Sequence, residues 1–106
     1  MGGTSYGIDG FRGLRRLGTD RSGKNFSKAV VDAVWEKGLI VPGVDPNVRR
    51  RDQYGSLIDY SQYGATVQNG TGWEIDHIVP VAKWGADQLS NLQPLQWENN
   101  RRKGDS

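Results

Sequence analysis

The chain has 106 residues, enough for one small domain and too few for two. It contains no cysteine, so disulfides, thiolate zinc sites and thiol nucleophiles are excluded, and any catalysis must use oxygen and nitrogen groups. The formal net charge is only +2, and no apolar stretch approaches the roughly 20 residues that cross a bilayer. We therefore expect a soluble domain without membrane contact.

The N-terminal segment, residues 1–25, is rich in glycine and arginine and poor in apolar side chains. Such a segment buries too little surface to offset the entropy cost of ordering it. The composition predicts a flexible, basic, glycine-rich tail. A second interpretation is that these residues once joined the domain to an upstream part.

A helix is the first regular element that the pattern predicts. Ser27 can cap it, apolar residues repeat at helical spacing from Ala29 to Val34, and Gly38 can take the left-handed position that ends it. Residues 49–63 then predict a short hairpin in which Gly55 supplies the positive φ.

The C-terminal third predicts a strand, a loop, a second strand and a helix. Residues 73–79 alternate at strand spacing, Leu92 to Leu95 form a second short strand, and a helix runs from about Trp97 to Lys103 before Gly104. This order is a ββα unit at about residues 72–104. The expected fold class is α+β, as a small single domain with an N-terminal helix, a short hairpin and this unit.

Basic residues are concentrated in the first segment, in the middle and at the end of the chain. Such clusters suit a polyanion because each phosphate contact releases condensed counterions. The alternative is that they form a solvated surface. Beside the motifs below they favour nucleic acid, and the residues predicted to bind it are Lys83, Arg49, Arg50, Arg51, Arg101, Arg102 and Lys103.

Three short motifs occur in order in the C-terminal third: Asp76-His77-Ile78-Val79-Pro80, then Asn91-Leu92-Gln93-Pro94-Leu95, then Asn100-Arg101-Arg102-Lys103-Gly104-Asp105. In this order and spacing they resemble the HNH endonuclease family, also called His-Me finger nucleases. A weaker likeness extends upstream to Phe26, so residues 26–106 are expected to form the nuclease domain. The resemblance implies a ββα-metal fold and metal-dependent hydrolysis of DNA to 5′-phosphate and 3′-hydroxyl products.

The chemistry assigns a role to the only histidine. An imidazole with an unperturbed pKa near 6.5 can remove a proton from water around neutral pH, so His77 is the predicted general base. Asp76 and Asn100 supply hard oxygen ligands, which favour Mg²⁺ or Mn²⁺ as the bound metal. Neighbouring strand residues point to opposite faces, so Asp76 and His77 share a site only where the strand bends or ends.

The resemblance implies roles for further residues, and the chain departs from the family pattern in two places. Asn91 would bridge the hairpin loop and keep His77 aimed at the phosphate, while the basic residues of the last helix would contact flanking phosphates. Gln96 and Asn99 stand where relatives carry zinc-binding cysteines, so no structural Zn²⁺ is expected. Trp84 stands where glycine is common, and a substrate-facing role is one interpretation of it.

Two other side chains and the wider context complete the sequence-based predictions. Glu74 is expected at the surface, and Asp87 is expected to stabilise the loop turn. A non-catalytic DNA-binding module, or the toxic nuclease domain of a larger bacterial effector with an immunity protein as partner, are the alternatives. The predicted location is the cytoplasm of a bacterial or phage-infected cell, with secretion as an effector left open, and the predicted state is a monomer or weak dimer.

Overall fold

The computed structural model describes residues 15–104, so the part of the expected tail at residues 1–14 lies outside the described residues. The described part is a small α+β domain with two helices and two small sheets, which confirms the predicted class. In chain order its helices and strands are α1 (Lys28–Trp35), β1 (Leu39–Ile40), β2 (Arg49–Arg51), β3 (Leu57–Asp59), β4 (Trp73–His77), β5 (Leu92–Gln96) and α2 (Trp97–Lys103).

Both sheets are antiparallel. The first has the order β1-β2-β3, and the second consists of β4 and β5 alone, with Trp73 opposite Gln96 and His77 opposite Leu92. The predicted hairpin is confirmed as β2 and β3, and Gly55 in its turn has a φ of +87°, which a residue with a side chain rarely adopts.

Helix α1 begins where the sequence predicts and ends earlier. The Ser27 side chain accepts a hydrogen bond from the backbone N–H of Val30, as a helix cap does. The last helical residue is Trp35, so the prediction that Gly38 closes the helix in a left-handed conformation was wrong. Gly38 is instead needed for close packing, because a Cβ there would lie 3.0 Å from Cβ of Arg50.

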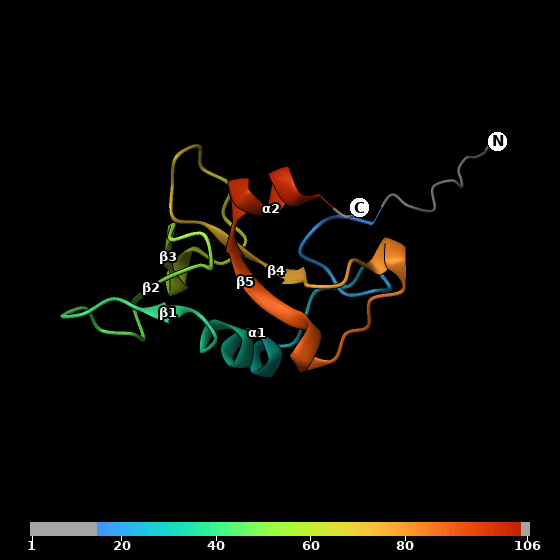
Figure 1. Ribbon diagram of the computed structural model, residues 1–106, viewed down its shortest axis with the longest axis horizontal. Helices are drawn as coiled ribbons and strands as arrows, with labels where there is room; N and C mark the ends of the chain where they lie inside the picture. The colour runs from blue at the N-terminus through green and yellow to red at the C-terminus, as the bar shows by residue number, and fades with distance from the viewer. Residues whose placement is uncertain (1–14, 105–106) are drawn as a thin grey trace.

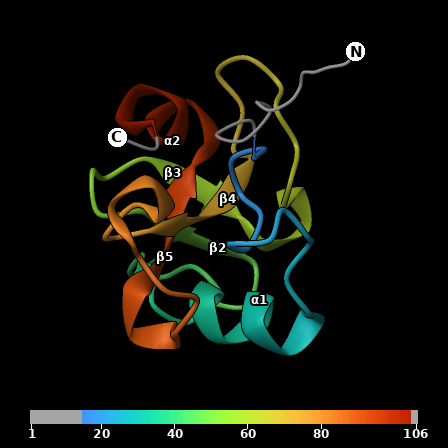
Figure 2. The ribbon, with the colours of Figure 1, turned by 90° about the vertical axis from the view of Figure 1, so that its right-hand side faces the viewer.

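The core lies between α1 and the β4–β5 pair. Val34, Trp35, Ile58, Trp73 and Leu92 are buried together in one cluster. Helix α2 lies on the other side of β4 and β5 from α1 (Figure 1, Figure 2). The β4–β5 pair is therefore covered on both faces.

Residues 15–25, which the composition assigns to the tail, carry turns and hydrogen bonds to the domain. The carboxylate of Asp20 accepts hydrogen bonds from the backbone N–H groups of Lys24 and Ser22, and the bond from Lys24 is the main cause that lowers the pKa of Asp20. The backbone N–H of Arg21 donates to Asp87. The polar groups of this segment thus supply the contacts that its few apolar side chains cannot.

The carboxylate of Asp52 connects the hairpin to the β5–α2 junction. Its side chain is buried, with the residue only 1% exposed. One oxygen accepts from the backbone N–H groups of Tyr54 and Ser56, and the other accepts from Gln96 N at 2.9 Å and Asn99 Nδ2 at 2.8 Å. Four donors replace the water that this charge loses on burial.

Replacing Asp52 with alanine is expected to lower the free energy of unfolding by about 2–4 kcal/mol, because buried donors lose their acceptor. Urea unfolding measures the change. Asp45→Ala is the matched control, since Asp45 also accepts a hydrogen bond within a turn but is exposed, and we expect it to cost less than about 1 kcal/mol. Equal losses for the two variants would contradict this role of Asp52.

Candidate active site

Strand β4 is buried along its whole length, and its side chains alternate between the two covered faces. Glu74 and Asp76 point toward α2, where their hydrogen-bond partners Arg101 and Lys103 lie. His77 points the other way, toward the face on which Leu92 lies opposite it. The strand ends at His77, the predicted base, so the alternation of side chains between the two faces also ends there.

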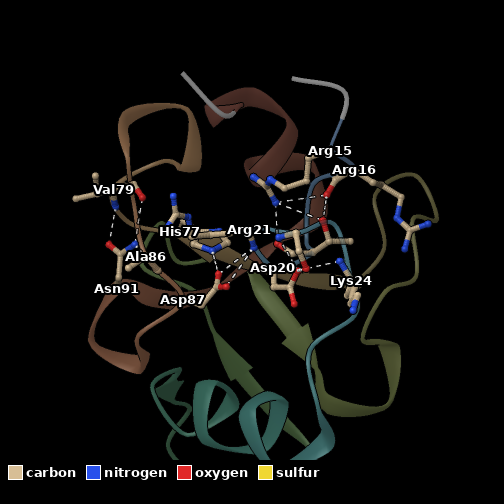
Figure 3. Close-up of polar contacts among 12 residues, drawn as sticks. Arg15, Arg16, Asp20, Arg21, Lys24, His77, Val79, Ala86, Asp87 and Asn91 are labelled. Atoms are coloured by element: carbon tan, nitrogen blue, oxygen red, sulfur yellow. Dashed lines mark hydrogen bonds and ion pairs between the residues drawn. The ribbon is translucent and has the colours of Figure 1, made fainter. Parts of the chain in front are cut away.

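His77 is held by a carboxylate. Its ring atom Nε2 lies 2.7 Å from Oδ1 of Asp87 (Figure 3). The ring centroid of Phe26 lies 6.0 Å from that of the imidazole. Only 2% of the His77 side chain is exposed. Among the described residues, the second ring nitrogen, Nδ1, makes no hydrogen bond.

Asp87 has a second partner besides the histidine. The backbone N–H of Arg21 donates to both of its carboxylate oxygens, at 3.1 and 3.2 Å. The sequence-based prediction gave Asp87 only a turn-stabilising role. No local pattern marks this contact, because Arg21 and Asp87 are 66 residues apart in the chain.

Asp76 is buried with two partners on the α2 side of β4. Its Oδ1 atom lies 3.1 Å from Nζ of Lys103, and its Oδ2 atom accepts a hydrogen bond from Gln93 at 2.9 Å. Lys103 also donates to the backbone carbonyl of His77 at 2.9 Å. One ammonium group therefore joins the last turn of α2 to the end of β4.

Asn100 presents a buried oxygen without a partner. The residue is 1% exposed, and its Nδ2 group donates to Oε1 of Glu74 at 2.8 Å. Its Oδ1 atom makes no hydrogen bond within the described residues. A buried carbonyl without a donor costs free energy, so such an atom in a native site calls for an explanation such as an ion.

Glu74 fixes the orientation of that carboxamide. Its carboxylate accepts from Asn100 and also from two nitrogens of Arg101, at 2.9 and 2.8 Å. An acceptor beside Nδ2 keeps the amide group on that side and leaves Oδ1 on the other. The prediction that Glu74 lies at the surface was wrong, because these three bonds compensate its burial.

The structure places Asp76 and Asn100 on the same side of β4, and His77 on the opposite side at its end. Within residues 15–104, no cluster of three or more histidine, cysteine, aspartate or glutamate side chains could hold a metal ion. A carboxylate and an unpartnered carbonyl oxygen are nevertheless hard donors, which fit Mg²⁺ when water and phosphate complete the shell. The donor set thus fits the expected cation.

Asn91 closes the loop that follows β4. Its Oδ1 atom accepts from the N–H of Val79 at 2.8 Å, and its Nδ2 group donates to the carbonyls of Val79 and Ala86 (Figure 3). The carboxamide thus joins the start of the loop to its far side. Its importance for catalysis remains a prediction.

Arg50 is a structural cation. It is 8% exposed, donates to the backbone carbonyls of Pro46, Glu36 and Gly38, and lies over the Trp35 ring. The turn between α1 and β2 thus uses this guanidinium, and the contact of Arg50 with nucleic acid stays a prediction.

The other basic residues predicted to contact phosphate differ in their surroundings. Arg49 donates to Asp59 at 2.7 and 3.0 Å, and these bonds lower the pKa of that carboxyl. Arg51 and Arg102 line a common groove of about 570 Å³ beside α2. Lys83 is exposed on the loop between β4 and β5.

Trp84 follows Lys83 and is 85% exposed. Its φ of 70° is left-handed, which is the conformation that glycine takes without strain and that other residues rarely adopt. The neighbouring Gly85 is buried, and a Cβ there would lie 1.7 Å from the carbonyl oxygen of Val79. The loop therefore turns tightly against the end of β4 and leaves the indole in solvent.

Residues 64–106 match the family model described as HNH endonuclease. The C-terminal part of the chain is therefore similar to the HNH endonucleases. The match covers all three motifs and confirms the family expected from them. This likeness indicates nuclease activity in general, with nucleic acid as the substrate. No curated protein and no solved structure matched the chain. Within the described part of the chain, no helix is long and apolar enough to span a bilayer.

Replacing Arg50 with alanine is expected to lower the free energy of unfolding by about 2–3 kcal/mol, because three backbone carbonyls, one of them buried, lose a charged donor. The neighbouring Arg51→Ala change should cost less than about 1 kcal/mol, since Arg51 is exposed and donates only to Gly55. Urea midpoints compare the two variants. A stable Arg50→Ala protein would show that its hydrogen bonds are dispensable.

Proposed function

We propose that this HNH protein is a metal-dependent endonuclease that hydrolyses phosphodiester bonds of DNA to 5′-phosphate and 3′-hydroxyl ends. His77 acts as the general base, and Asp76 and Asn100 hold one Mg²⁺, or Mn²⁺ in its place. The observation that carries the proposal is the buried, unpartnered Oδ1 atom of Asn100 on the side of β4 to which Asp76 points.

The side chains around the proposed ligands support this use. Glu74 orients the Asn100 carboxamide, and Gln93 together with Lys103 holds the Asp76 carboxylate. When bound, the cation would neutralise charge that develops on the phosphate in the transition state and stabilise the leaving oxygen. The protein supplies the fixed geometry, because each ligand is itself hydrogen-bonded.

His77, at the end of β4, would accept a proton from the attacking water. Asn91 keeps the start of the following loop in position. Phosphate contacts from Arg51, Arg102 and Lys83 would hold the DNA without reading its sequence. Arg49, Arg101 and Lys103 already pair with carboxylates, so a phosphate contact from any of them would compete with that carboxylate.

One observation favours a second candidate, a non-catalytic DNA-binding module. The His77 side chain is 2% exposed, and a base that takes a proton from water needs access to it. A binding module would retain DNA in a salt-dependent manner and would not nick it with any divalent metal.

The His77→Ala change is expected to reduce plasmid nicking by about 10²- to 10⁴-fold, the usual contribution of a general base. EDTA should abolish nicking by the unchanged protein. DNA retention should persist in the variant, because the basic side chains are intact. Nicking that survives either treatment would contradict the proposed roles.

The Asn100→Ala change should raise the Mg²⁺ concentration needed for half-maximal nicking at least about tenfold, because one ligand oxygen is lost. The matched control is Asn99→Ala, which removes buried hydrogen bonds to Asp52 and Ser56 from the same helix. If Asn99→Ala changes the metal requirement equally, Asn100 acts only through stability.

A further inference from the structure

We propose that Asp87 is the positioning residue of His77, and that the backbone N–H of Arg21 in turn positions Asp87. The proposal rests on the proposed nuclease function, in which His77 is the base. It assigns the two ring nitrogens: Nε2 carries the proton that Asp87 accepts, and Nδ1 takes the proton from water. It also makes residues 15–25 part of the active site.

The first step is the contact between the ring and the carboxylate. Oδ1 of Asp87 lies 2.7 Å from Nε2 of His77, a short distance that is typical of a bond with an ionised partner. An ionised carboxylate only accepts hydrogen bonds, so in the neutral imidazole the proton is on Nε2. The lone pair is then on Nδ1, which makes no hydrogen bond within the described residues.

The second step is the orientation of the ring. Phe26 packs against the imidazole at 6.0 Å between centroids, and the side chain is almost fully buried. Packing limits where the ring can go, but it does not distinguish the two nitrogens. The hydrogen bond to Asp87 does so, because a flipped ring would place a carbon atom next to the carboxylate.

The third step is what holds Asp87, whose own side chain is 40% exposed. An exposed aspartate has rotamer freedom, so it orients a partner well only if it is itself held. The N–H of Arg21 donates to both of its oxygens (Figure 3). Arg21 is the second residue of a turn closed by the bond from Gly23 N to Asp20 O at 2.9 Å.

That turn is stabilised from within. The carboxylate of Asp20 accepts from the backbone N–H groups of Ser22 and Lys24 and from the hydroxyl of Ser22. These bonds leave the N–H of Arg21 directed outward, toward the loop after β4. The turn at residues 20–23, which is distant from His77 in sequence, thereby positions the Asp87 carboxylate. That carboxylate in turn positions the His77 ring.

The single histidine of the chain makes a direct test possible. Histidine labelled with ¹⁵N gives one imidazole in the NMR spectrum, recorded well above the ordinary histidine pKa of about 6.5. We expect a proton on Nε2 that is shifted downfield and protected from exchange with water. In Asp87→Ala this protected signal should be lost, and in the control Asp45→Ala it should be unchanged. A proton on Nδ1, or the same protected signal in Asp87→Ala, would overturn the assignment.

Kinetics separate positioning from a structural role. Asp87→Ala should lower kcat about 10- to 100-fold, the usual cost of losing the carboxylate that orients a functional histidine, while KM for DNA changes less than about twofold. Urea midpoints show whether the variant is folded. A change confined to KM, or a loss of kcat that follows only the loss of stability, would contradict the positioning role.

The contribution of the Arg21 N–H is tested with a matched pair of variants. Proline is favoured at the second position of such turns and lacks the N–H, so Arg21→Pro removes the donor. Arg21→Ala removes the side chain and keeps the N–H. We expect Arg21→Pro to weaken the protected Nε2 signal and lower kcat several-fold relative to Arg21→Ala. Equal behaviour of the two variants would refute the coupling, and a higher kcat in Arg21→Pro would show that the segment covers the site instead.

The outcomes for the two proposals are distinct. An unchanged protein that cleaves no DNA with Mg²⁺ or Mn²⁺ overturns the proposed function. An active protein whose kcat is unaffected by Asp87→Ala overturns only the inference about Asp87.

Discussion

The burial of β4 on both faces is the constraint on which the rest of the structure depends. A strand buried on one face leaves every second side chain in water, but all five residues of β4 are buried. Three of them, Glu74, Asp76 and His77, are polar or charged. Each therefore requires a partner from the covering elements, and those requirements determine how α2, the following loop and residues 15–25 are placed.

Helix α2 meets this requirement on one side. Arg101 neutralises Glu74 and Lys103 neutralises Asp76, so two buried carboxylates have cations from one helix. Removing either partner would leave an uncompensated charge, which is far more costly than the pair is stabilising. The same helix carries Asn100, whose Oδ1 is the only buried side-chain acceptor without a partner among the described residues. The stability of the domain is thereby connected to its proposed metal site.

The sequence predicted those parts of the fold that have local signals. Ser27 marks the start of α1, Gly55 marks the hairpin turn, and the alternation after Trp73 marks β4, because capping, positive φ and pleat act over a few residues. The functions of Gly38 and Arg50 were missed because each depends on the other across the turn between α1 and β2. The contact of Arg21 with Asp87 had no signal in the sequence, since only the folded chain brings them together.

The most direct test of the central claim is a crystal structure grown with Mn²⁺, in which anomalous scattering locates the ion. The account predicts one peak within coordinating distance of a carboxylate oxygen of Asp76 and of Oδ1 of Asn100, with Glu74 still bound to Nδ2 of that carboxamide. A peak bound by Glu74 in place of Asn100, or a saturating Mn²⁺ concentration that leaves Oδ1 of Asn100 without an ion, would contradict it.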